Sequence, residues 1–256
     1  MNWVKKKNLP AIEAIYHEGQ PCNNLEALWN ALHSSYNSAD NRAISTRFLD
    51  GINQCNDIDW PPFTGQEFKD AIAKCSNASS PGPDHITWRH LKLLILDKAC
   101  LSKVVDIANA CITIGYWPDQ FKESTSVIIL KPNKTSYNTP KLFRPIVLLN
   151  TMGKLIEKVI SNRLQFHLLA NGFLDPNQLG GIRQRLTIDA GMYFTHLIHA
   201  GWMKECHTSV IAFDIAQFFP SLNHDFLSLC LAKAGLNANV LKFFINYHSN
   251  RSTTYT

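Results

Sequence analysis

Apolar residues recur three and four positions apart over most of the chain, and this spacing predicts amphipathic helices. The predicted helices cover residues 25–32, 65–76, 88–96, 101–114, 151–171 and 224–234. Thr64 and Glu67 have the spacing of a capping box at the start of the second of them. Gly115 and Gly172 follow two others, as glycine commonly follows the last turn of a helix. Residues 1–60 are also expected to be mostly helical, with Asn23 or Asn24 capping a helix.

Shorter apolar runs outside these helices predict strands. The runs 126–132 and 143–149 flank a polar loop, Asn133 to Thr139, and predict a short antiparallel sheet. The run from Val210 to Phe213 is wholly apolar and is followed at once by Asp214, which predicts a buried strand that ends in a carboxylate. The fold class expected from these elements is α+β, mostly helical with a short antiparallel sheet.

The composition is typical of a folded intracellular protein. A hydrophobic content of 45% over 256 residues allows a sizeable core, in one large domain or two small ones. Seven cysteines without a CxxC pair favour a reducing compartment, the nucleus or the cytoplasm. Pro10 and Glu13 stand where a signal peptide needs its apolar core, and no apolar run has the length of a membrane span. We expect no secretion and no membrane partner.

Positive charge is concentrated in one part of the chain. Residues 122–185 hold ten Lys or Arg against three acidic residues, a net charge of +7 in a chain whose total is +5. The remainder therefore sums to −2. This distribution indicates binding to a polyanion such as nucleic acid. A solvated basic surface without a specific partner is the alternative.

Asp214 is the first candidate for chemistry. A carboxylate at the end of a buried strand needs a partner to offset its desolvation, and Mg²⁺ is a common one. The alternative is that Asp214 only caps the turn that follows the strand.

Several stretches, taken in their order along the chain, resemble the reverse transcriptases of non-LTR (LINE-type) retrotransposons. They are Pro81-Gly82-Pro83-Asp84, Lys131-Pro132, Arg144-Pro145-Ile146, the helix with Lys154, Glu157, Arg163 and Leu164, the segment Gln178 to Ala190, and Phe213-Asp214-Ile215 with Phe218-Phe219. His85 stands where the family usually has glycine, and Gly181 and Ile182 also depart from its pattern. The resemblance spans residues 61–256, and each motif by itself is of weak to moderate specificity.

This resemblance implies roles for individual residues. It assigns the phosphates of the incoming nucleotide to Lys131 and Arg144, and the sugar of that nucleotide to Phe219. It implies that Asp214, with the carbonyl of Ile215, holds Mg²⁺ or Mn²⁺ in two-metal nucleotidyl transfer. The residues that it implies for template binding are Pro83, Asp84, Gln178, Gly180, Arg183, Arg185 and Thr187. The implied partners are an RNA template, a DNA primer and deoxynucleoside triphosphates.

The resemblance also implies a right-hand polymerase architecture. We expect a helical extension or linker at residues 1–60, fingers at 61–208, and the start of a ferredoxin-like palm at 209–256. The family's later Asp-Asp hairpin has no counterpart, because the sequence contains no Asp-Asp dipeptide. We therefore expect an incomplete palm that is inactive alone, with open sheet edges that favour self-association or the missing polymerase parts as partners. The alternatives are a non-catalytic nucleic-acid-binding remnant and a domesticated interaction protein.

Overall fold

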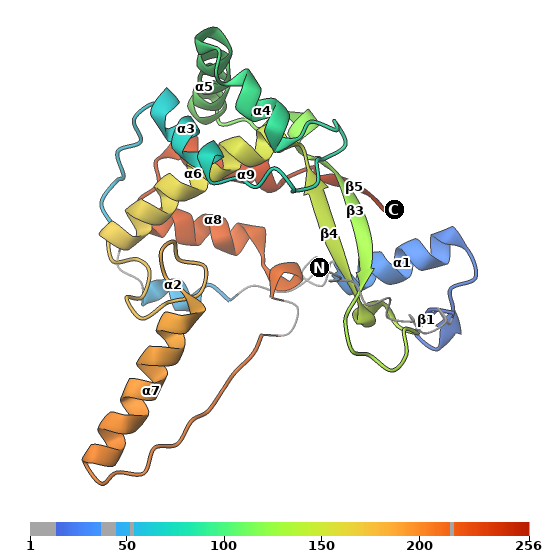
Figure 1. Cartoon of the computed structure of the whole chain (residues 1–256), viewed down its shortest axis with the longest axis vertical. Helices are drawn as coiled ribbons and strands as arrows, with labels where there is room; N and C mark the ends of the chain where they lie inside the picture. Colours follow the sequence, from blue (N-terminus) through green and yellow to red (C-terminus); the bar gives the residue numbers. More distant parts are fainter. Residues whose placement is uncertain (1–13, 37–44, 52–53, 216–217, 256) are drawn as a thin grey trace, which may run out of the picture.

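The computed structural model describes residues 14–36, 45–51, 54–215 and 218–255. Over these ranges the protein is mostly helical, as predicted (Figure 1). It has two small sheets where a single short antiparallel sheet was predicted, and the sheet of β1 and β2 lies in a region that was expected to be helical. The helices are α1 (Leu25–Tyr36), α2 (Arg47–Asp50), α3 (Gly65–Ala73), α4 (Trp88–Leu94), α5 (Lys98–Ile114), α6 (Thr151–Ala170), α7 (Thr187–Met203), α8 (His224–Lys233) and α9 (Ala238–His248). The strands are β1 (Tyr16–His17), β2 (Gln20–Pro21), β3 (Glu123–Leu130), β4 (Phe143–Leu149) and β5 (Ser252–Tyr255). Short 3-10 turns lie at η1 (Asp119–Phe121), η2 (Pro140–Leu142) and η3 (Phe219–Ser221).

The six helices predicted from the spacing of apolar residues are all present, and their ends lie within a few residues of the predicted ones. Local signals explain this agreement. The Thr64 side chain accepts from the Glu67 amide while Glu67 reaches back to the Thr64 amide, which completes the predicted capping box. Gly115 has φ 67°, the left-handed conformation that ends α5. Asn24 accepts a hydrogen bond of 2.7 Å from the Ala27 amide at the start of α1.

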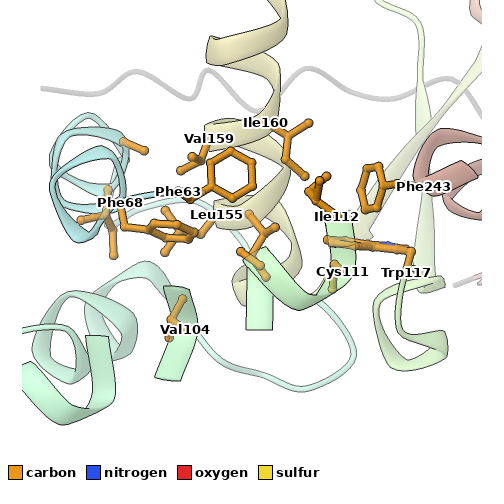
Figure 2. Packing of buried hydrophobic residues seen from close by; sticks show 14 of the residues in the cluster. Phe63, Phe68, Val104, Cys111, Ile112, Trp117, Leu155, Val159, Ile160 and Phe243 are labelled. Carbon is orange, nitrogen blue, oxygen red and sulfur yellow. The ribbon is translucent and has the colours of Figure 1, made fainter. Parts of the chain in front are cut away.

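One hydrophobic core joins α3, α4, α5, α6, α8 and α9. The buried stripe of α6 includes Leu155, Val159 and Ile160, which lie among side chains of the neighbouring helices (Figure 2). Trp117 is 0% exposed and meets the ring of Phe243 edge-on, with a centroid distance of 5.6 Å. Helix α9, which carries Phe243, was not among the predicted helices and closes one side of this core.

The larger sheet has the strand order β4-β3-β5. Strands β3 and β4 are antiparallel, as predicted, whereas β5 runs parallel to β3 and was not predicted. Two serines of β3 contribute to this pairing. Ser124 Oγ donates 3.0 Å to the Ser252 carbonyl, and Ser126 Oγ lies 2.7 Å from Thr253 Oγ1. These contacts join residues more than 120 positions apart, so no local sequence signal marks them.

The loop that contains Pro81, Gly82 and Pro83 packs against the end of β4. At Gly82 a side chain would collide with the backbone of Leu149 and Asn150, so only glycine allows this approach. His85, where the resembling family has glycine, has φ 55° and so keeps a backbone conformation that glycine adopts freely. Asn150 secures the loop by accepting from the Asp84 amide at 3.3 Å.

The prediction of a buried strand before Asp214 is wrong. Residues 206–215 have no regular secondary structure, and Phe213 is 91% exposed. A strand needs a neighbour to satisfy its backbone N–H and C=O groups, and no described strand lies beside this segment. The apolar run therefore lies exposed on the surface between α7 and α8 (Figure 1).

Helix α7 has no buried residue, although it is rich in apolar side chains. It stands away from the other helices (Figure 1). Its exposed apolar residues are Ile188, Met192, Tyr193, Phe194, Leu197, Trp202 and Met203. Within the described ranges, no helix is both long enough and apolar enough to cross a membrane.

Candidate functional site

The β3–β4 hairpin brings the two predicted phosphate-binding residues together. Ile129 pairs with Arg144, and the Lys131 amide donates 2.9 Å to the Leu142 carbonyl, so the register continues past the end of β3. Residues directly opposite in an antiparallel pair share a face, and diagonal neighbours on it lie about 7–8 Å apart. Lys131 and Arg144 are such diagonal neighbours. The Arg144 side chain is exposed at this end of the sheet.

The loop between the two strands is held by bonds that involve Lys131. The Tyr137 hydroxyl donates 2.6 Å to the Lys131 carbonyl, and Lys131 Nζ donates to the Lys141 carbonyl. Tyr137 is only 4% exposed, and its ring packs edge-on against Phe143. The position of the Lys131 ammonium therefore depends on the conformation of residues 137–142.

Pro83 and Asp84, predicted to contact template, lie on the loop before α4. The Asp84 side chain is exposed and accepts from the Ile86 amide at 3.1 Å. Lys154 Nζ, from α6, donates 3.2 Å to the Ser80 carbonyl of the same loop. Burial lowers the pKa of Lys154, and the negative charge of Asp84 opposes that shift. The loop is thus fixed to the start of α6 with Asp84 at the surface.

The segment 178–187 forms a second exposed surface, at the other end of α6 (Figure 1). Arg185 Nη1 donates to the carbonyls of Pro176, at 2.6 Å, and of Gln178, so its guanidinium holds the turn together. Arg183 is anchored through its backbone, by a 2.8 Å bond from its amide to Gln165. Its side chain lines a cavity of about 300 Å³ beside Glu67 and residues of α3 and α6. Gly180 and Thr187 lie on the same segment.

Asp214 and its neighbours lie on the extended segment between α7 and α8. Asp214 is exposed, and it forms no ion pair with any residue in the described ranges. Ile215 is 63% and Phe219 84% exposed, and the rings of Phe218 and Phe219 meet edge-on at 5.3 Å. The structure does not bring this segment onto the sheet that carries Lys131 and Arg144 (Figure 1).

Comparison with protein families gives a match over residues 129–256, half of the chain, to reverse transcriptase (RNA-dependent DNA polymerase). The chain belongs to the reverse transcriptase family. It is related to the reverse transcriptases of non-LTR retrotransposons. The match includes the end of β3 with Lys131, all of β4 and α6, the 178–187 segment and Asp214.

Three relatives illustrate this relationship. A probable RNA-directed DNA polymerase from transposon BS of Drosophila melanogaster is 30% identical over 72% of this chain and 19% of its own length. One from transposon X-element of the same fly is 27% identical over 80% of this chain and 24% of its own length. The retrovirus-related Pol polyprotein of the type-1 retrotransposable element R1 of Bradysia coprophila is 25% identical over 76% of this chain and 19% of its own length. This reverse transcriptase chain therefore spans about a fifth of the length of such relatives.

Reverse transcriptases generally use Mg²⁺, and Asp214 with the adjacent Ile215 carbonyl offers oxygen ligands for it. A two-metal site needs further carboxylates to clamp both ions. Among the described residues, no three side chains of His, Cys, Asp or Glu come together in a way that could hold a metal. The residues described here therefore do not by themselves form a two-metal site.

Sequence reasoning assigned no role to Arg163, which proves to be a structural anchor of this reverse transcriptase. Its Nη2 lies 2.6 and 2.8 Å from the two carboxylate oxygens of Glu67, and its guanidinium lies 4.2 Å from the ring centre of Phe63. Burial tends to raise the pKa of Glu67. The Thr64 amide and the Arg163 charge outweigh burial and hold that pKa below its ordinary value. The ion pair of Arg163 with Glu67 fixes α6 to the start of α3. The two residues lie 96 positions apart, so no local sequence pattern predicts their contact.

Proposed function

We propose that this chain supplies the fingers and the start of the palm of a retrotransposon reverse transcriptase, with the phosphates of the incoming deoxynucleotide bound by Lys131 and Arg144. The single observation that supports this most is the register of β3 and β4, which makes the two cations diagonal neighbours on one face. A lysine point charge beside an arginine fork suits a triphosphate. Neither cation forms an ion pair with a described residue that would compete with phosphate.

The RNA template and DNA primer are the proposed nucleic-acid partners. The exposed Asp84 loop and the exposed 178–187 segment adjoin opposite ends of the basic helix α6. We assign template binding to Pro83, Asp84, Gln178, Gly180, Arg183, Arg185 and Thr187. Arg183 is the better placed of the two arginines, because the Arg185 guanidinium is already engaged by backbone carbonyls.

A binding experiment tests this proposal. We expect the full chain to bind an RNA–DNA primer–template duplex with an affinity that falls steeply with salt. Replacing Lys131 and Arg144 together by Gln should weaken the binding of dTTP, whereas replacing Arg183 by Gln should reduce the slope of log duplex affinity against log salt by about 0.9 for each phosphate that is no longer neutralised. The matched control replaces Lys69, Lys98 and Lys103, exposed lysines of α3 and α5, by Gln. A control variant that loses as much affinity for dTTP and for the duplex as these variants do would refute binding sites at the predicted residues.

Catalysis is proposed for the intact polymerase only. There Asp214 and the Ile215 carbonyl are ligands of Mg²⁺ or Mn²⁺, Phe219 contacts the nucleotide sugar, and the further carboxylates come from outside this chain. Residues 1–60 are then an extension, 61–208 fingers and 209–256 the first part of the palm. We expect the purified chain and its Asp214→Ala variant alike to extend no primer on an RNA template with Mg²⁺. Extension by the wild type alone would show that the missing groups are supplied, for example by a second copy.

A second candidate is a nucleic-acid-binding protein without catalysis. It is favoured by the contrast between the paired strands of the basic β3–β4 hairpin and Asp214, which is exposed and forms no ion pair with a described residue. Duplex binding that is unaffected by Asp214→Ala, with no extension even after adding the rest of a related polymerase domain, would support it. The exposed apolar surface of α7 and of residues 209–215 and 218–219 also fits self-association or a domesticated role in protein interaction.

A further inference from the structure

Residues 14–36 contact the loop that lies between Lys131 and Arg144. The Tyr36 hydroxyl, at the end of α1, donates 3.2 Å to the Pro140 carbonyl. The Tyr16 amide, in β1, donates 2.7 Å to the Asn138 carbonyl. His17 and Ser34 lie 3.1 Å apart and join β1 to α1, so that the two contacts come from one N-terminal unit, residues 14–36.

The same loop residues also hold Lys131. Residues 137–142 receive both bonds from the N-terminal unit, and the Lys131 ammonium donates to the Lys141 carbonyl in the middle of that stretch. The Tyr137 hydroxyl, from the same stretch, donates a hydrogen bond of 2.6 Å to the Lys131 carbonyl. A displacement of residues 137–142 would therefore displace the Lys131 side chain relative to Arg144.

The surroundings of Tyr36 favour a persistent contact. Tyr36 is half-buried, and burial, together with the electrostatic influence of Tyr255, raises its pKa to about 12. Its hydroxyl is therefore protonated and able to donate at neutral pH. The contact of Tyr36 with Pro140 joins two parts of the chain that lie 104 positions apart in sequence.

We propose that the N-terminal unit positions the nucleotide-binding pair, with Tyr36 as the positioning residue that holds the 137–142 loop and, through it, Lys131. This inference rests on the proposed function for its effect on triphosphate binding. Its structural part, the hold on the loop, is independent of that function. It assigns a role to a region in which the sequence predicted only an extension or linker.

The test compares Tyr36→Phe with Tyr116→Phe in the full chain. Both variants lack one hydroxyl and keep the ring. The Tyr116 ring lies next to Lys122, which precedes the first residue of β3, whereas the 137–142 loop follows the last residue of β3. Hydrogen exchange is followed at the amides of residues 131–142, and the dissociation constants of dTTP and of the primer–template duplex are measured. Removal of one hydrogen bond should speed exchange of this segment about two- to tenfold in Tyr36→Phe only.

The binding constants separate positioning from general stabilisation. In Tyr36→Phe the dissociation constant of dTTP should rise by a similar factor. The dissociation constant of the duplex should stay unchanged, because the proposed template-binding residues Arg183 and Arg185 lie outside the 137–142 loop. Unchanged exchange at 131–142 would overturn the proposal, and so would faster exchange without weaker dTTP binding. If the wild type binds no dTTP, the proposed function fails, and the exchange comparison alone decides whether the N-terminal unit holds the loop.

Discussion

The Tyr247 hydroxyl of α9 donates a hydrogen bond of 3.0 Å to the Glu157 carboxylate of α6. Arg251, just before β5, donates 3.0 Å to the Tyr247 carbonyl, and its guanidinium lies 4.6 Å from the centre of the Tyr247 ring. Burial raises the pKa of Glu157, and the bond from Tyr247 opposes that shift. These three residues join the central helix to the C-terminal part of the chain.

Replacing Tyr247 by Phe should leave the half-buried Glu157 carboxylate without the hydrogen bond from the Tyr247 hydroxyl. We expect the free energy of unfolding to fall by about 1–3 kcal/mol, the cost of an unsatisfied buried polar group. Urea unfolding measures the change, and Tyr193→Phe on the exposed helix α7 is the control. A decrease equal to that of the control would show that the bond contributes nothing to stability.

His248 should make stability depend on pH. It stacks on His224 with a centroid distance of 4.5 Å, and burial, together with the charges of His224 and Arg251, lowers its pKa from 6.5 to about 4. The unfolded chain therefore binds a proton more readily than the folded one between these values. The contribution of neutral His248 to the stability of the folded state is fully present above pH 6.5 and is lost as the pH falls toward 4.

The variant His248→Gln isolates this effect. As the pH falls from 6.5 toward 4, we expect the free energy of unfolding of the wild type to decrease relative to that of the variant. Urea unfolding at several pH values measures it, with His199→Gln on α7 as the control. A difference that stays constant with pH would contradict the assignment.

Gly82→Ala should loosen the Pro-Gly-Pro loop. The added methyl group would collide with the backbone of Leu149 and Asn150, and such overpacking costs about 1–3 kcal/mol. Gly191→Ala is the matched control, because that position in α7 has open space around it and should gain about 0.5–1 kcal/mol. Thermal unfolding of the two variants should therefore shift in opposite directions.

The exposed apolar surface should cause self-association. Analytical ultracentrifugation of the wild type is expected to show concentration-dependent oligomers, and Met192→Glu combined with Phe213→Glu should reduce them. Leu96→Glu, at a residue that is 77% exposed between α4 and α5, is the control for charge alone. A wild-type protein that stays monomeric at high concentration would refute self-association through this apolar surface.

The sequence predicted most accurately those features that neighbouring residues determine. Thr64, Asn24 and Gly115 mark helix ends through contacts within one turn, and the short polar loop made the β3–β4 pairing and the approach of Lys131 to Arg144 predictable. Contacts between distant segments carry no such signal. The parallel strand β5 and the contact of Tyr36 with Pro140 were therefore not predicted.

The segment before Asp214 shows the limit of reasoning from apolar runs. Val210 to Phe213 has the composition of a buried strand, but a strand exists only where a second strand satisfies its backbone. Composition reports the tendency of a segment and not the presence of its partner. The predicted roles of Asp214, Ile215 and Phe219 thus depend on groups that the described residues do not provide.

The parallel pairing of β3 with β5 has a consequence for biosynthesis. The Ser124–Ser252 contact spans 128 residues, so at about 5–20 residues per second the ribosome needs roughly 6–25 s between making its two partners. The β3–β4 hairpin can form within that time, but the other edge of β3 stays open until β5 is translated. During this interval a nascent chain exposes a strand edge that another nascent chain of the same polysome can capture.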